Sequence, residues 1–164
     1  MTYSIPLRDP PVTVQEPHQC WSAAYESWST ACSWIIPGAT PVSEASIEAC
    51  LAQYPNALDA HGGATSGGIG LLQNVGNVQF EGVAGADLSS ALLQSHLTRF
   101  GYIFLPFWAH GRHGIFSHAV VISHASNGRM RVMDPGEGRG LSTVNTSYYR
   151  NAIVMLIGTH QQAH

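Results

Sequence analysis

A cysteine stands directly in front of a long run of apolar residues in the stretch VQEPHQCWSAAYESWSTACSWI, residues 14–35. After this cysteine the apolar side chains recur at steps of three and four, the spacing that places them on one face of an α-helix. They are Trp21, Ala24, Tyr25, Trp28, Ala31, Cys32 and Ile35. Pro37-Gly38 follows and stops such a helix. The stretch therefore predicts a helix from Trp21 to Ile35 that packs one face into a core.

Further helices are expected on the C-terminal side of this stretch, and an extended arm before it. The arm is residues 1–17, which contain four prolines. A glycine-rich segment between residues 61 and 77 reads as a loop that includes a short helix. The helices predicted after the first are 43–53 with Ser43 as its cap, 69–75 inside the glycine-rich segment, and 87–100 with Asp87 as its cap.

After Gly101 the chain changes to short runs of branched and aromatic residues bounded by glycine, asparagine and proline, a pattern typical of strands. The runs are YIFLPFWA (102–109), SHAVVIS (117–123), RMRVMD (129–134) and AIVMLIG (152–158). Helices first and strands later is the order of an α+β fold. We therefore predict N-terminal helices packed on a C-terminal antiparallel sheet. No repeat or linker divides the chain, so a single domain over residues 1–164 is expected.

The composition excludes several classes of partner. The chain has 164 residues, of which 45% are hydrophobic, enough to bury a core. Its formal net charge is −3, and its seven basic residues are scattered arginines without the basic patch that nucleic acids and anionic membranes attract. No stretch reaches the roughly 18 apolar residues of a membrane span. We expect neither nucleic acid nor membrane as a partner.

The chain offers no recognisable metal, cofactor or export signal. Its three cysteines include no C-x-x-C pair and fit reduced thiols, and the absence of lysine excludes Schiff-base chemistry. His110, His113, His118 and His124 match no familiar spacing of metal ligands, so no metal and no cofactor are expected. The segment TYSIPLRDPP after Met1 lacks the basic and apolar regions of a secretory signal.

Cys20 is the candidate nucleophile. A thiol in the first turn of a helix lies at the positive end of the helix dipole, which favours the thiolate form. Cys32 and Cys50 lie on the apolar faces of their predicted helices, as expected of core residues. A thiolate nucleophile needs a histidine partner and a polar group that orients the imidazole. His118 opens an apolar strand and Asp134 ends the next one, so they are the candidates for these two roles.

The register of these two strands tests that assignment. A two-residue turn at Asn127-Gly128 pairs Ser126 with Arg129 and places His118 and Asp134 on opposite faces of the hairpin. A five-residue loop over 124–128 pairs Ser123 with Arg129 and places the two candidates opposite each other. The triad hypothesis therefore predicts the longer loop.

The motif Q-x4-C-W-S-A-A at residues 15–24, followed by S-H-A-V-V-I at 117–122 and an acid sixteen positions after the histidine, resembles the papain-like cysteine peptidases. It resembles in particular their compact bacterial members, which include effector and toxin proteases and peptidases that cut after double glycines. The resemblance implies a papain-like fold, Cys20 as nucleophile, His118 as base and acid, and Asp134 as the orienting residue, where papain has asparagine.

The resemblance also implies an oxyanion hole made by the side-chain amide of Gln15 and the backbone N–H of Cys20. Gln15 stands one residue closer to the cysteine than its counterpart in papain, and Gln19 is the alternative donor. Trp21 beside the nucleophile and Gly67 and Gly68 of the glycine-rich loop are the expected substrate contacts, and the aromatic run at 102–108 is expected to form another wall of the groove.

The expected function is that of a cysteine endopeptidase acting on a protein or peptide, with cleavage at double glycines as the substrate class that the resemblance implies. The setting that fits is a bacterial effector or toxin, held silent by a cognate immunity protein over the Cys20 groove. We expect it in the bacterial cytoplasm or delivered by a secretion system into a target cell. The same triad serves a protein glutamine deamidase or an acyltransferase, and an inert binding module on this scaffold is the other alternative.

Overall fold

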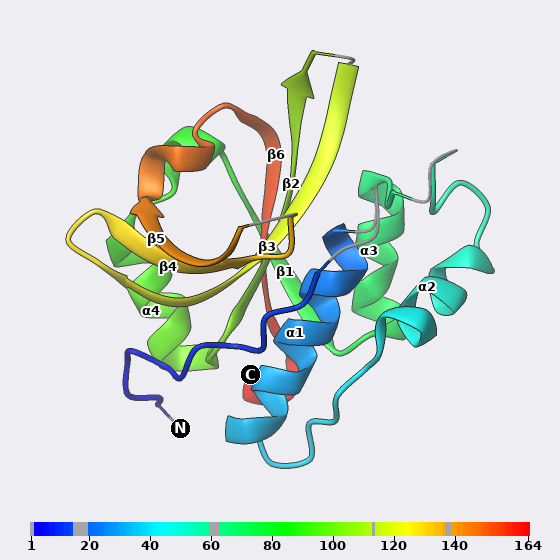
Figure 1. Cartoon of the computed structure of the whole chain (residues 1–164). Coiled ribbons are helices and arrows are strands. Elements are labelled where there is room, and N and C mark those ends of the chain that lie inside the picture. The colour runs from blue at the N-terminus through cyan, green and yellow to red at the C-terminus, as the bar shows by residue number, and fades with distance from the viewer. Residues whose placement is uncertain (1, 15–19, 60–62, 113, 137–138) are drawn as a thin grey trace.

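The computed structural model describes residues 2–14, 20–59, 63–112, 114–136 and 139–164. Figure 1 shows its elements: the four α-helices all end by residue 100, and every strand except β1 begins after it. The helices are α1 (Cys20–Ile35), α2 (Glu44–Ala52), α3 (Ser66–Val75) and α4 (Ser90–Phe100), with short 3-10 turns η1 (Gly85–Asp87), η2 (Thr146–Tyr149) and η3 (Gln161–Ala163). The strands are β1 (Val78–Val83), β2 (Ile103–Gly111), β3 (Gly114–Ser126), β4 (Arg129–Asp134), β5 (Gly140–Asn145) and β6 (Ala152–His160).

In the described part of the chain, six strands form one antiparallel sheet in the order β1-β6-β2-β3-β4-β5. The last strand in sequence, β6, pairs with β1 on one side and with β2 on the other. The β2–β3 hairpin extends beyond its neighbours at the top of the view (Figure 1). The predicted α+β class is confirmed, with N-terminal helices packed on an antiparallel sheet.

Helices cover both faces of the sheet, and each face has its own apolar cluster. On one face α1 packs across β2 and β3, with Trp28 donating its indole N–H to the carbonyl of Tyr102 at 2.9 Å. The predicted apolar face of α1 is buried in this cluster together with residues of α2 and α3. On the other face α4 packs against β3 and β6 (Figure 1). Because α1 lies across β3, its first residue comes close to the strand that carries His118.

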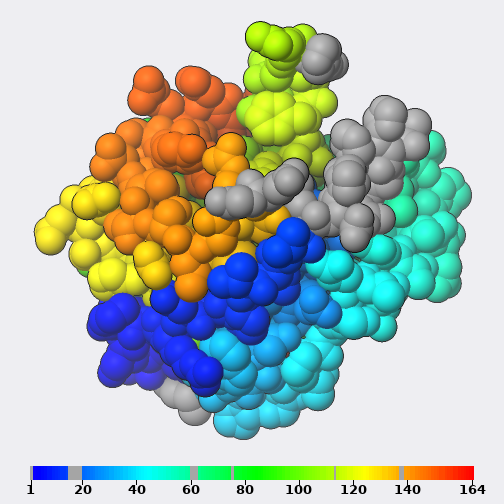
Figure 2. All heavy atoms as spheres, viewed as in Figure 1, coloured from blue at the N-terminus to red at the C-terminus, as the bar shows by residue number. Residues whose placement is uncertain are grey.

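The N-terminal segment 2–14 contains no helix or strand, as predicted for the proline-rich arm. It is fixed by backbone hydrogen bonds from Tyr3 N to Thr98 O at 2.7 Å and from Leu7 N to Ser123 O at 3.2 Å. The segment lies between the β4–β5 region and α1 on the face seen in Figure 2. The arm thus contacts α4 through Thr98, and it contacts β3 at Ser123, where that strand is irregular.

The helix boundaries follow their capping residues. The predicted helices at 21–35 and 43–53 are confirmed, the second with the side chain of Ser43 accepting from Ser46 N. α3 begins about one turn earlier than predicted because Thr65 caps it by accepting from Gly68 N. The predicted start at Asp87 is wrong: Asp87 lies in η1, and Ser89 caps α4 by accepting from Leu92 N.

The predicted five-residue loop between β3 and β4 is also wrong. Asn127 and Gly128 form a two-residue turn with φ of 52° and 74°, and Ser126 pairs with Arg129. The register then shifts between Ile122 and His124, a β-bulge at Ser123. A bulge inserts one unpaired residue and so reverses which side chains share a face beyond it. The bulge therefore does what the longer loop was expected to do, and places His118 and Asp134 on the same face.

The sequence pattern did not predict β1 and β5. Both are edge strands, and most of their side chains are exposed or half-buried. An edge strand with polar residues on its open side lacks the continuous apolar run that marks the inner strands. What identifies them as strands is their pairing in the sheet, of β1 with β6 and of β5 with β4.

Candidate active site

Cys20 is the first residue of α1, and its side chain is almost fully covered, with 3% of the residue exposed. Its thiol donates a hydrogen bond to the backbone carbonyl of Ser117 at 3.5 Å. The first turn of α1 contains no acidic residue that would oppose a negative charge there. The helix dipole is positive at this end, so a developing sulfur anion is stabilised where Cys20 lies.

His118 follows Ser117 on β3 and connects the sulfur to a carboxylate. Its Nε2 lies 2.8 Å from Oδ1 of Asp134, the last residue of β4. This leaves Nδ1 as the ring nitrogen available to Cys20, whose sulfur interacts with the imidazole. Phe107 on the paired strand β2 packs its ring edge-on against the imidazole, with centroids 5.6 Å apart. The ring is thus held by a hydrogen bond on one side and by an aromatic contact on the other.

The surroundings of His118 favour its protonated form. Burial alone lowers the pKa of this imidazole, but the hydrogen bond to Asp134 and the interaction with Cys20 outweigh it and raise the pKa from 6.5 to about 9. A carboxylate and a thiolate on opposite sides of an imidazolium stabilise its positive charge in a site with little water. Once Cys20 is a thiolate, the ring therefore carries at neutral pH the proton that a departing amine would need.

Asp134 is held in place by three neighbouring groups. Its side chain is 6% exposed, and Oδ1 accepts both from His118 and from the backbone N–H of Gly136 at 2.8 Å. Oδ2 lies 3.9 Å from Nη1 of Arg139. Burial raises the pKa of Asp134, but these partners outweigh it, and the pKa lies below its usual value of 3.8. Asp134 is therefore a carboxylate at neutral pH and can stabilise the imidazolium.

Gly136 and Arg139 were not among the predicted site residues. Both belong to the segment DPGEGRG, residues 134–140, whose glycines and proline are typical of a turn and do not by themselves mark a site. A side chain at Gly136 would press on the carboxylate, since a Cβ atom there would lie 3.0 Å from Oδ1 of Asp134. The turn after β4 thus supplies the backbone donor that fixes the carboxylate.

A groove of about 430 Å³ opens beside His118 and Asp134. Its walls are mainly aromatic: Phe107, Phe116, Tyr148 and Tyr149. Phe107 and Tyr149 pack against each other with ring centroids 4.5 Å apart. Phe107 belongs to the aromatic run that was predicted to form a wall. Among the residues that line it, the groove offers an apolar surface next to the imidazole and one guanidinium, that of Arg139.

The residues expected to form the oxyanion hole or to contact the substrate are found in different surroundings. Gln15 and its alternative Gln19 lie outside the described residues. Trp21 is 1% exposed and packs in the core, and Gly68 is buried where a Cβ would collide with the backbone of Ala57. The structure gives these two residues packing positions instead of the surface positions that substrate contacts require. Gly67 is exposed on α3, and its contact with substrate stays a prediction.

Two of the histidines weighed as metal ligands, His118 and His124, have other partners, and His113 lies outside the described residues. His118 pairs with Asp134, and Nε2 of His124 lies 3.3 Å from Oγ of Ser126. Over the described residues, no three side chains of histidine, cysteine, aspartate or glutamate come together as a metal site. Nor does any helix in that part of the chain have the length and apolar character needed to cross a membrane.

Comparison with known proteins identifies the fold. No protein-family model matches the chain, and no curated protein matches it either. Among solved structures, the peptidase domain of Streptococcus ComA, a bifunctional ABC transporter involved in a quorum-sensing pathway, is similar with a TM-score of 0.65 and 15% identity. The match covers 94% of this chain and 100% of that domain.

Two further structures show the same likeness. A double-glycine motif protease from an AMS/PCAT transporter, solved with its leader peptide, has a TM-score of 0.58 and 13% identity, covering 97% of each chain. The peptidase domain of Streptococcus mutans ComA has a TM-score of 0.52 and 14% identity, covering 90% of this chain and 98% of that one. The chain therefore has the papain-like fold of double-glycine peptidase domains, as its motifs predicted.

Proposed function

We propose that the protein is a cysteine peptidase that cleaves a peptide bond through Cys20, His118 and Asp134. The observation that carries the proposal is the convergence of these three groups: the Cys20 thiol contacts the carbonyl of Ser117, the residue directly before His118, and the His118 imidazole bonds the Asp134 carboxylate. A nucleophile, a proton donor and an orienting acid in this order are what acyl transfer by a thiol requires. The likeness to double-glycine peptidase domains supports the assignment at the level of fold.

In this mechanism the Cys20 thiolate attacks the scissile carbonyl carbon and forms a tetrahedral intermediate. The backbone N–H of Cys20 and the side-chain amide of Gln15 donate to its oxyanion. His118 then gives the proton on Nδ1 to the departing amine, and an acyl-enzyme remains on the sulfur. The neutral imidazole takes a proton from water, which attacks the thioester and restores the thiolate. Asp134 accepts from Nε2–H throughout and keeps the ring in the required tautomer.

The thiol must leave its resting contact before it reacts. In the structure the Cys20 thiol donates to the Ser117 carbonyl, which a thiolate cannot do because it has no proton. Transfer of that proton to Nδ1 of His118 converts the pair into thiolate and imidazolium. The raised pKa of His118, about 9, favours this transfer.

The proposed substrate is a peptide segment with a double glycine at the cleavage site. The double-glycine motif protease of similar fold is a complex with a leader peptide. In the present chain the aromatic groove beside His118 is suited to an apolar side chain of such a segment, since Phe107, Phe116 and Tyr149 offer it a surface. Cys20 is almost fully covered by its neighbours, so little space is left around its sulfur. The two glycines of the substrate have no side chains, and their backbone can therefore approach the sulfur closely.

The test uses the purified chain and peptides with an apolar segment before Gly-Gly, analysed by mass spectrometry. The wild-type protein should cut after the second glycine, and Cys20→Ala should lower kcat/KM by about 10³-fold or more. Cys50→Ser is the matched control, because Cys50 is a half-buried thiol on α2, outside the contacts of the site. The epoxide thiol trap E-64 should modify Cys20 in the wild-type protein. It should modify Cys20 to the same extent in the Cys50→Ser variant.

Two results would overturn the proposal. Undiminished cleavage by purified Cys20→Ala protein would remove the nucleophile from the mechanism. A mass gain of one dalton on a glutamine-containing protein, with no cut in the chain, would instead identify a deamidase acting through the same thiol.

A further inference from the structure

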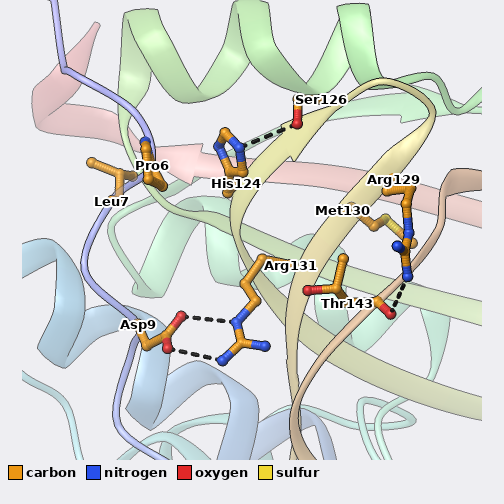
Figure 3. A pocket seen from close by; sticks show the side chains of 9 residues that line it. All are labelled: Pro6, Leu7, Asp9, His124, Ser126, Arg129, Met130, Arg131 and Thr143. Atoms are coloured by element: carbon orange, nitrogen blue, oxygen red, sulfur yellow. Dashed lines mark hydrogen bonds and ion pairs between the residues drawn. The ribbon is translucent and has the colours of Figure 1, made fainter.

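A second cavity, of about 330 Å³, lies where the N-terminal segment passes the β3–β4 hairpin (Figure 3). Its lining residues include none of Cys20, His118 and Asp134. Apolar atoms come from Pro6, Leu7 and Met130, and charged groups from Asp9, Arg129 and Arg131. A volume of this size is within the range of small-molecule sites, roughly 300–1,000 Å³, which combine an apolar surface with a few polar groups.

The charges around this cavity do not balance. Arg131 donates Nε and Nη2 to the two carboxylate oxygens of Asp9, at 3.1 and 3.0 Å, and this pair is neutral (Figure 3). Arg129 donates Nη2 to the backbone carbonyl of Thr143 at 3.3 Å. No carboxylate of the described residues lies within ion-pair distance of Arg129. The cavity is thus lined by two guanidinium groups and one carboxylate, which leaves the positive charge of Arg129 without a counter-charge at its wall.

A buried nitrogen in the same wall has no partner. His124 lies between Pro6 and Ser126, and its Nε2 is 3.3 Å from Oγ of Ser126 (Figure 3). Its other nitrogen, Nδ1, is buried and has no hydrogen-bond partner among the described residues. When Nε2 accepts from the Ser126 hydroxyl, Nδ1 carries the proton and is a donor. Pairing this donor with a ligand oxygen requires the ring to turn toward the cavity, which one long hydrogen bond opposes only weakly.

We propose that this cavity binds a small organic carboxylate with an apolar body. The carboxylate pairs with Arg129, whose planar guanidinium can donate two parallel hydrogen bonds to it. The apolar body packs on Pro6, Leu7 and Met130, and Nδ1 of His124 donates to a further oxygen. A neutral ligand would leave the charge of Arg129 uncompensated, and an inorganic anion would leave the apolar wall uncovered. The site is independent of the peptidase activity proposed above.

The experiment titrates the full chain, labelled with ¹³C on its methionine methyl groups, with N-acetyl-L-phenylalanine. Met130 lines the cavity, whereas Met133 and Met155 lie in the core away from it. The Met130 signal, assigned with a Met130→Leu variant, should shift and saturate while the Met155 signal stays in place. The neutral N-acetyl-L-phenylalaninamide should bind about tenfold more weakly, as expected for the loss of a charge-assisted pair.

Arg129→Gln should weaken binding of the acid by about tenfold and bring it to the level of the amide. Arg112→Gln is the matched control, because it removes one exposed arginine charge from the β2–β3 turn, outside the cavity. The proposal is overturned if the Met130 signal does not move, if acid and amide bind equally, or if Arg112→Gln weakens binding as much as Arg129→Gln.

Discussion

His118 and Asp134 meet through a 2.8 Å hydrogen bond although they do not face each other in the register of their strands. Beyond the bulge, Ile122 pairs with Val132 and Val121 with Met133. In this register Asp134 lies on the same face as His118 but two residues away from the position directly opposite it, so the two are diagonal neighbours. Diagonal neighbours on one face are within reach of long side chains. The single unpaired residue Ser123 is therefore what brings the imidazole and the carboxylate together.

Replacing the carboxylate should change the titration of its imidazole. Asp134→Asn removes the negative charge that helps to raise the pKa of His118 to about 9, so this pKa should fall, since burial then acts with less opposition. The measurement is an NMR pH titration of the histidine Cε1–H signals in both proteins. Asp9→Asn, which removes a carboxylate that pairs with Arg131 and not with His118, should leave the His118 titration unchanged. An unaltered midpoint in Asp134→Asn would contradict the role assigned to the carboxylate.

The raised pKa of His118 also predicts how stability depends on pH. A group whose pKa is higher in the folded state stabilises that state at low pH and loses this effect as pH rises through the folded pKa. The contribution should be complete below pH 6.5 and should disappear by about pH 9. Urea unfolding of the wild type and of His118→Gln across this range should give a difference in unfolding free energy that shrinks as pH rises. A constant difference would show that His118 is not protonated preferentially in the folded protein.

Gly136→Ala should impair the reaction without loss of substrate binding. The added Cβ would lie 3.0 Å from Oδ1 of Asp134 and 3.0 Å from Cδ of Arg139, so the carboxylate must shift. A misplaced carboxylate leaves His118 less well oriented, and we expect kcat to fall by roughly tenfold with KM little changed. Gly70→Ala, where a Cβ meets nothing within 4 Å, is the control and should keep full activity.

The turn between β3 and β4 should depend on its glycine. Gly128 has φ of +74° and open space around a Cβ, so Gly128→Ala should destabilise the protein through backbone strain alone, by about 1 kcal/mol. Gly70 also has open space but lies in the middle of α3, where alanine is favoured by about 0.5–1 kcal/mol. The two substitutions add the same methyl group and should move the midpoint of denaturant unfolding in opposite directions.

Much of this architecture could be read from local patterns. The spacing of apolar residues in 21–35 predicts α1, and the runs from residue 102 onward predict four inner strands, because burial on both faces leaves a strong pattern. The bulge at Ser123 could not be predicted, since nothing in the residues 117–126 distinguishes it from a regular strand. The Asn127-Gly128 dipeptide indicated the correct two-residue turn, and the expectation of a longer loop came only from the need to join His118 and Asp134.

The sequence pointed to the candidate-site residues that act through their side chains. It did not point to Gly136, which contributes through its backbone N–H. Cys20, His118 and Asp134 are recognisable by residue type and position, whereas the N–H of Gly136 acts through the conformation of a turn. Trp21 and Gly68 adjoin predicted site features in sequence, but packing places both in the interior. A toxin role, a delivery route and an immunity partner stay predictions from the resemblance.

The position of β6 has a consequence for how the protein is made. β6 lies between β1 and β2, so these two strands join one sheet only after residues 152–160 have left the ribosome. Cys20 emerges far earlier, and the Ser117 carbonyl that its thiol contacts follows 97 residues later. The nascent chain therefore carries its thiol through the synthesis of at least these 97 residues without the imidazole and carboxylate that would activate it.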